Sequence, residues 1–244
     1  MSTERPFKME PIDESREALH ALHAEGVRLE ADLRMMAREA QRIVPDCVGL
    51  SLADLQGGLT FTLVATDLDI AALDAIQYLD GGPCVDSVHQ ERIEHATPTD
   101  LTSEKRWSMF AEMSAAHGVA STLTLPILDG ETVVGSVNLY ASTADAFDGH
   151  HDDLANALGA SALGAVTNAD LSFSTRFDSQ RAPAHLADSD DVNIAIGIIA
   201  ARHGVDVGTA GERLRLAAAR AGITDAQAAR AVRFSLDHES GQDQ

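Results

Sequence analysis

Six arginines within residues 191–234 are the side chains whose type and spacing most clearly suggest a binding chemistry. They are Arg202, Arg213, Arg215, Arg220, Arg230 and Arg233. Only four acidic residues share this segment, so it is mildly basic although the whole chain carries a formal net charge of −20. Arginine has a planar, permanently charged fork that pairs with phosphate and stacks on flat rings. The segment therefore indicates a surface that binds phosphate groups or bases, and a solvated helix face is the alternative interpretation.

The arginines stand in a segment whose pattern predicts three short helices. The first is expected over 190–203, and the second follows a capping Asp206 and ends at Gly222. Thr224 and Gln227 form a capping box at the start of the third. The expected core positions are Ile194, Ile198 and Ala201 in the first helix, Ala210, Leu214, Ala217, Ala218 and Ala221 in the second, and Ala228, Ala229, Val232 and Leu236 in the third. A core of such small residues is marginal alone, so we expect support from the preceding helix or from a second copy of the chain.

On these helices the arginines are expected outside the core. At about 100° per residue, Arg213 and Arg220 share one flank of the second helix and Arg215 lies on the other. Arg230 and Arg233 are neighbours one turn apart on the third helix. The pattern thus places cations on several outer faces of a compact helical unit.

Composition restricts the class of protein. Apolar residues make up 45% of the chain, which allows a substantial core, and no apolar run is long enough to span a membrane. The polar, acidic beginning lacks the apolar stretch of a signal peptide. Cys47 and Cys84 alone form neither a disulfide framework nor a four-cysteine zinc site, and the ten histidines do not cluster with suitable partners. We therefore expect a cytoplasmic protein with no membrane association and no metal site.

Residues 25–170 alternate between strand and helix signals of an α+β type. The expected elements are a helix over 13–44, strands over 48–52 and 61–65, short helices and loops over 67–107, a helix over 106–117, a hairpin that turns at Asp129-Gly130, and a helix over 149–170 capped by Asp148. Periodicity is lost over 171–187, which contains Pro183, so we expect the domain boundary there. The remaining divisions are an N-terminal tail with the start of the long helix over 1–24, a helical domain over 188–236 and a tail over 237–244.

Short motifs in this first domain occur in a specific order. They comprise the stretches 73–78, 81–86, 118–121, 125–127 and 138–140, together with Asp100-Leu101, Arg106-Trp107, Phe110, Gly135 and Ala146-Phe147. Over about residues 25–168 they resemble a subgroup of GAF domains found in actinobacterial regulators. The resemblance implies an antiparallel sheet with helices on both faces, dimerisation through terminal helices, and a small-molecule pocket between the sheet and the helical excursion. The signature of cyclic-nucleotide-binding GAF domains is not visible, and the ligand is not identified.

Aromatic residues and one thiol are the candidates for lining such a pocket. They are Phe61, Tyr78, Cys84, Trp107, Phe110 and Tyr140. The alternative is that the aromatic side chains are simply core. Cys84 follows Gly-Pro, where a thiol can be partly exposed and sense redox state, and a quiet buried thiol is the alternative.

The C-terminal segment carries a second resemblance. Residues 194–199, 204–206, Ala210, Leu214-Arg215 and Ala218 resemble the motifs of the ANTAR family over about residues 188–234. The resemblance implies a dimeric protein that binds paired RNA hairpins in nascent transcripts and promotes transcription antitermination. Two positions depart from the family's pattern. Ile196 stands where the family commonly has lysine, and Gly211 stands where it commonly has an aromatic residue.

The resemblance turns the arginine-rich helices into a candidate RNA surface. The expected RNA contacts are Arg202, Arg215, Arg220, Arg230 and Arg233, with Ala195 and Gly197 allowing close approach. A ligand in the first domain is expected to shift the helix over 149–170 and so to change the spacing of two RNA-binding domains. The alternative function is a sensory protein whose C-terminal helices bind another protein or dimerise. With two cysteines and no catalytic constellation, we do not expect an enzyme.

Overall fold

The structure is a computed structural model. It describes residues 24–56, 58–89, 107–163, 165–168 and 188–234. The expected linker over 171–187, the C-terminal tail and almost all of the N-terminal tail lie outside the described residues. Within them the chain is α+β, as the sequence predicts.

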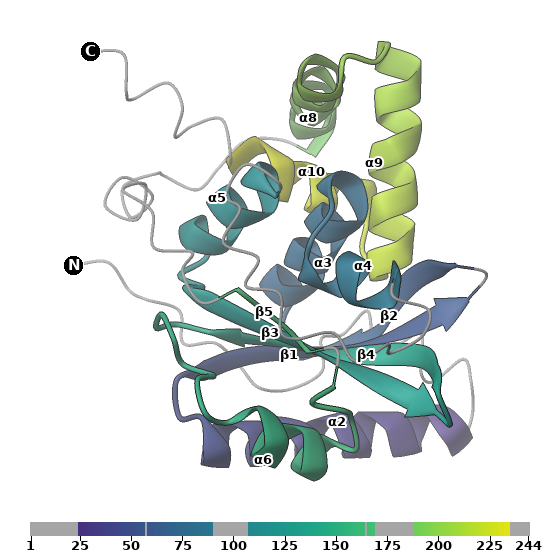
Figure 1. Cartoon of the computed structure of the whole chain (residues 1–244). Coiled ribbons are helices and arrows are strands. Elements are labelled where there is room, and N and C mark those ends of the chain that lie inside the picture. The colour runs from purple at the N-terminus through teal and green to yellow at the C-terminus, as the bar shows by residue number, and fades with distance from the viewer. Residues whose placement is uncertain (1–23, 57, 90–106, 164, 169–187, 235–244) are drawn as a thin grey trace.

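A five-stranded antiparallel sheet with the strand order β2-β1-β4-β3-β5 divides the molecule into two layers (Figure 1). Its strands are β1 Cys47–Gln56, β2 Leu59–Ala65, β3 Ser121–Asp129, β4 Thr132–Ala141 and the short β5 Val166–Asn168. The hairpin predicted at Asp129-Gly130 is confirmed, and Gly130 there has a φ of +63°. The predicted first and second strands are also confirmed and are longer than expected. The sequence pattern did not predict β5.

The prediction of a helix over 149–170 is wrong. α6 spans only His151–Leu158, because Gly159 adopts a left-handed conformation with a φ of 67° and ends the helix. The chain then returns to the sheet, where β5 pairs with β3. Asp148 is not the cap either, since His150 occupies the N-cap position without a side-chain hydrogen bond.

Two helices cover one face of the sheet. α2 Ala24–Ile43 and α6 lie against β1, β3 and β4 (Figure 1). Their layer is apolar and includes the fully buried Leu33, Leu123 and Leu139. The helix predicted over 13–44 ends at Ile43, one residue earlier than expected. Its expected residues 13–23 lie outside the described residues.

The other face carries α3 Leu68–Asp80, α4 Pro83–His89 and α5 Ser108–Ala116 (Figure 1). The Asp67 side chain caps α3 by accepting a hydrogen bond from the Asp69 N–H at 2.8 Å. Gly81 and Gly82 separate α3 from α4. The sequence predicts short helices and loops over 67–107. The first part of this range is instead one regular helix, α3, of 13 residues.

The three C-terminal helices are confirmed as α8 Asp188–His203, α9 Val207–Ala221 and α10 Asp225–Phe234. Their local signals operate as expected. Asp206 Oδ1 accepts from the Thr209 N–H at 3.0 Å, and Thr224 and Gln227 cap each other's backbone at 3.2 and 2.7 Å.

The buried face of α8 differs from the prediction. Ala195, Ile198 and Ile199 are buried, whereas Ile194 and Ala201 are exposed. The helix is rotated by about one position because Ala195 and Ile199, four residues apart, share the side that faces the rest of the molecule. The expected buried positions of α9 are all confirmed.

The support that this small helical core needs comes from the first domain. α9 and α10 pack on α3, α10 also contacts α5, and one continuous apolar cluster runs from α3 and α5 through all three C-terminal helices (Figure 1). Among the residues that the structure describes, no helix combines the length and apolar character needed to cross a lipid bilayer.

Candidate functional site

The two faces of the sheet differ in chemistry. In β4, Val137 and Leu139 point into the apolar layer with α2 and α6, whereas Ser136, Asn138 and Tyr140 point toward α3. This follows from the period-two alternation of a strand. The side of the sheet that faces α3 therefore carries buried polar groups. Burying such groups costs free energy unless they are hydrogen-bonded.

Those groups form a connected network, which we call the polar cluster. It consists of Ser51, Thr62, Asp74, Gln77, Cys84, Thr124, Ser136, Asn138 and Tyr140. All of these residues except Thr62 are at most 2% exposed. They come from β1, β2, β3, β4, α3 and α4, so only the tertiary fold brings them together.

Asp74 on α3 is the first centre of the polar cluster. Its carboxylate accepts hydrogen bonds from the Tyr140 hydroxyl, from Thr62 Oγ1 at 2.9 Å and from Gln77 Nε2 at 3.4 Å. Burial nevertheless outweighs these bonds and raises the pKa of Asp74 to about 6. Asp74 can therefore exist as a neutral donor or as a charged acceptor near neutral pH.

Asn138 on β4 is the second centre. Its Oδ1 accepts from Thr124 Oγ1 at 3.1 Å, and its Nδ2 donates to Ser51 Oγ at 3.1 Å. Gln77 and Cys84 connect the two centres. Gln77 Oε1 accepts from the Cys84 N–H at 2.8 Å, and Cys84 Sγ lies 3.5 Å from Ser136 Oγ.

A buried titratable group with a shifted pKa, held by a network of donors and acceptors, is a candidate functional group. A purely structural network is the alternative, since connected buried hydrogen bonds also specify a unique core. Within the described ranges, no three histidine, cysteine, aspartate or glutamate side chains are placed so that they could hold a metal ion.

The structure separates the predicted pocket residues into three groups. Cys84 and Tyr140 belong to the polar cluster, and the Tyr78 hydroxyl lies 2.7 Å from Thr62 Oγ1 at its margin. Trp107 and Phe110 are buried in the apolar cluster shared with the C-terminal helices. Phe61 on β2 is partly exposed.

The sequence interpretation missed the polar members of this site. Asp74 and Gln77 are three residues apart within an otherwise apolar helix, and Ser136 and Asn138 alternate with buried valine and leucine. Polar residues at expected core positions were the available signal.

Of the two interpretations of Cys84, the quiet buried thiol is confirmed and the partly exposed thiol is not, because the side chain is fully buried. Burial raises the pKa of both Cys84 and Cys47 to about 12. The folded protein should thus have a thiolate fraction about a thousandfold below that of an ordinary thiol.

We expect iodoacetamide at pH 8 to alkylate both cysteines in urea and neither in the native protein within an hour, as measured by mass spectrometry. Rapid native labelling of Cys84 would show that the thiol is accessible and able to sense redox state.

The predicted RNA-contact arginines divide into engaged and exposed groups. Arg202 pairs with Glu112 at 2.9 Å and Arg233 pairs with Asp191. Arg220 Nε donates to the Thr60 carbonyl at 2.8 Å. By contrast, Arg215 and Arg230, together with Arg213, are exposed on α9 and α10.

The two small residues expected to allow close RNA approach also differ in position. Gly197 is on the exposed side of α8, where a Cβ atom would meet nothing within 4 Å. Ala195 is completely buried and offers no surface in this arrangement.

The two departures from the ANTAR pattern meet each other. A Cβ atom at Gly211 would lie 3.4 Å from Cδ1 of Ile196. The isoleucine thus lies over the position where the family pattern has an aromatic side chain. Ile196 and Gly211 are thus complementary in packing, and position 196 carries no cationic group.

Comparison of the chain with models of known protein families, with curated proteins and with solved structures gives no significant match.

Proposed function

We propose that this chain is a signal-responsive regulator in which a GAF-type sensory domain controls an ANTAR-type RNA-binding domain. The sensory domain comprises the sheet with α2–α6, and the polar cluster binds its small-molecule ligand. The domain formed by α8–α10 binds paired hairpins in nascent RNA as a homodimer and promotes transcription antitermination. The motif resemblances support this function together with the chemistry of the two sites.

The observation that carries the RNA-binding proposal is the exposure of Arg213 and Arg215 on α9 and of Arg230 on α10. Exposed guanidinium groups can fork onto phosphates and stack on the unpaired bases of hairpin loops. The acidic excess of the whole chain would repel RNA, so a local cationic face is required for such binding.

Replacement of Arg215 and Arg230 by glutamine tests this function. We expect the double variant to bind RNA about tenfold or more weakly near 0.1 M salt, because two phosphate contacts are lost. The slope of log affinity against log salt concentration should fall by about 1 for each arginine. The measurement is fluorescence anisotropy with a synthetic pool of RNAs that each carry two hairpins with randomised loops.

Arg38→Gln is the matched control, since Arg38 is an exposed arginine on α2 at the opposite face of the sheet. Its affinity and salt slope should equal those of the native protein. Equal losses in both proteins would indicate only a general charge effect, and absence of native binding at 0.1 M salt would contradict the RNA-binding function.

A protein-interaction function is the second candidate. Large apolar side chains are exposed on the outer helices, with Val207 at 67%, Leu216 at 64% and Ile194 at 40%. Exposed apolar groups beside polar ones are typical of protein interfaces. If the protein binds no RNA and Leu216→Ser abolishes its self-association in sedimentation measurements, this second function is favoured.

A further inference from the structure

Arg220 joins the C-terminal helices to the sensory domain. Its guanidinium carbon lies 4.2 Å from the centroid of the Tyr78 ring, a distance suited to a cation–π interaction. Its Nε also donates to the carbonyl of Thr60 on the edge strand β2. The side chain is partly buried, so these two contacts use the guanidinium face and one of its donors at the same time.

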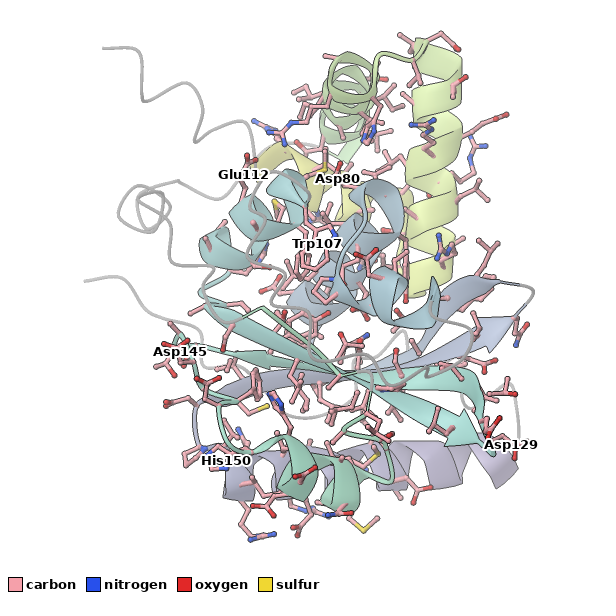
Figure 2. The ribbon with its side chains drawn as sticks, in the orientation of Figure 1. Asp80, Trp107, Glu112, Asp129, Asp145 and His150 are labelled. Carbon is pink, nitrogen blue, oxygen red and sulfur yellow. The ribbon has the colours of Figure 1, made fainter. Side chains whose placement is uncertain are left out.

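A second polar contact lies at the other end of the interface. Arg202 at the end of α8 pairs with Glu112 on α5 at 2.9 Å, and the neighbouring His203 Nε2 lies 3.5 Å from Asp80 Oδ1 at the end of α3. Figure 2 shows Glu112 and Asp80 on the side of their helices that faces α8, with Trp107 deeper in the molecule. The sensory domain thus holds the helical unit at two separated points.

These contacts occupy the groups that RNA binding needs. Arg202 and Arg220 are among the residues expected to touch RNA, yet here their donors and ring-stacking faces serve Glu112, Thr60 and Tyr78. A guanidinium that is stacked on tyrosine and bonded to a carbonyl cannot present the same face to a base or phosphate. The observed arrangement and full RNA contact therefore compete for donor groups at both residues and for one guanidinium face of Arg220.

We propose that the contact of α8–α10 with α3, α5 and β2 is an autoinhibitory docked state, and that RNA binds with full affinity only after this contact opens. This inference rests on the proposed RNA-binding function. The apparent affinity for RNA is then the intrinsic affinity reduced by the fraction of protein in the open state. The apolar cluster shared by α3, α5 and α8–α10 favours the docked state, so opening requires the free energy of ligand or RNA binding.

The polar cluster is linked to the docked state through one residue. The Tyr78 ring under Arg220 has its hydroxyl 2.7 Å from Thr62 Oγ1, and Thr62 donates to Asp74. A ligand that draws Tyr78 or Thr62 away would change the platform on which Arg220 rests. This route replaces the one expected through the helix over 149–170, since α6 ends at Leu158 on the opposite face of the sheet from α8–α10.

The test changes only the sensory side of the contact, so that every arginine remains. Glu112→Gln removes the partner charge of Arg202, and Tyr78→Leu removes the ring beneath Arg220. Asp129→Asn is the control, because Asp129 is an exposed acid at the β3–β4 turn, away from α8–α10 (Figure 2). Spin labels on cysteines introduced at the exposed positions Glu131 and Ala219 report the separation of the two units by pulsed electron resonance. Cys47 and Cys84 are buried, so we expect the spin label to attach to the introduced cysteines.

We expect the Glu112→Gln/Tyr78→Leu variant to show longer and broader label distances and to bind the two-hairpin RNA pool about tenfold more tightly. Glu112→Gln alone should give an increase of about threefold, and it keeps the test available if Tyr78→Leu does not fold. The control should match the native protein in both measurements.

The possible failures are distinguishable. Unchanged label distances in folded variants, or longer distances with unchanged RNA affinity, overturn the docked-state inference and leave RNA binding standing. If neither the native protein nor the open variant binds RNA, the proposed function fails, and the inference fails with it.

Discussion

Asp74→Asn is expected to become progressively more stable than the native protein as the pH rises from 4 to 7, with a total change of about 2.4 kcal/mol in the difference between their free energies of unfolding. The reason is the cost of charging a buried carboxyl. Burial raises the pKa of Asp74 to about 6 from the 3.8 of a solvated aspartate. Asparagine fills nearly the same volume and never carries the charge.

The direction follows from proton binding in the two states. Between pH 3.8 and 6 the unfolded chain has lost the Asp74 proton while the folded chain retains it. Folding therefore takes up a proton in this window, and the native protein loses stability as the pH rises. Above about pH 6 both states are ionised and the Asp74 contribution is constant.

Urea unfolding followed by circular dichroism at pH 4, 5, 6 and 7 measures this difference. Asp129→Asn is the control, since Asp129 is exposed and its removal should leave a pH-independent difference. A flat difference for Asp74→Asn would mean that the hydrogen bonds from Tyr140, Thr62 and Gln77 offset the burial of the carboxylate.

Gly135→Ala is expected to destabilise the protein by about 3 kcal/mol, at the upper end of the usual cost of overpacking. An added Cβ atom would lie 2.4 Å from the carbonyl oxygen of Ala53 in the adjacent strand β1. Backbone atoms of a paired strand cannot rotate away as a side chain can. Relief requires β1 and β4 to separate at the end of their pairing, where Asp54 is opposite Gly135, the residue before Ser136 of the polar cluster.

Gly197→Ala provides the matched control for this substitution. A Cβ atom there meets nothing within 4 Å, and Gly197 lies inside α8. Alanine should stabilise the helix by about 0.5–1 kcal/mol, because it restricts the unfolded chain and favours helix. Chemical unfolding at pH 7 measures the free energy of unfolding of both variants. A Gly135→Ala protein as stable as the native protein would show that the sheet adapts by a small shift. Weaker RNA binding by a stabilised Gly197→Ala protein would support close approach of RNA at this position.

The packing of Ile196 over Gly211 bears on the proposed RNA mode. The pair preserves contact between α8 and α9 without a large aromatic group. Among the described residues of α8–α10, the arginines classed as exposed are Arg213 and Arg215 on α9 and Arg230 on α10. RNA binding by this chain is therefore expected to depend on α9 and α10 more than on a cation in the middle of α8.

Features with local causes were predictable from the sequence. The Thr224–Gln227 capping box, the cap at Asp206 and the turn at Gly130 depend on residues at most three positions apart. The alternation in β3 and β4 likewise needs only each strand's own pattern. The sequence by itself therefore determined the α+β class, the central hairpin and the three C-terminal helices.

Features that join distant segments were decided only by the tertiary structure. Asp74 meets Tyr140, 66 residues away, and Arg220 meets Thr60, 160 residues away. No local propensity specifies such pairs, because their free energy depends on burial and on partners that folding supplies. The same dependence explains why α8 is rotated toward Ala195 and why Arg202 and Arg220, predicted to contact RNA, are instead bound to α5 and β2.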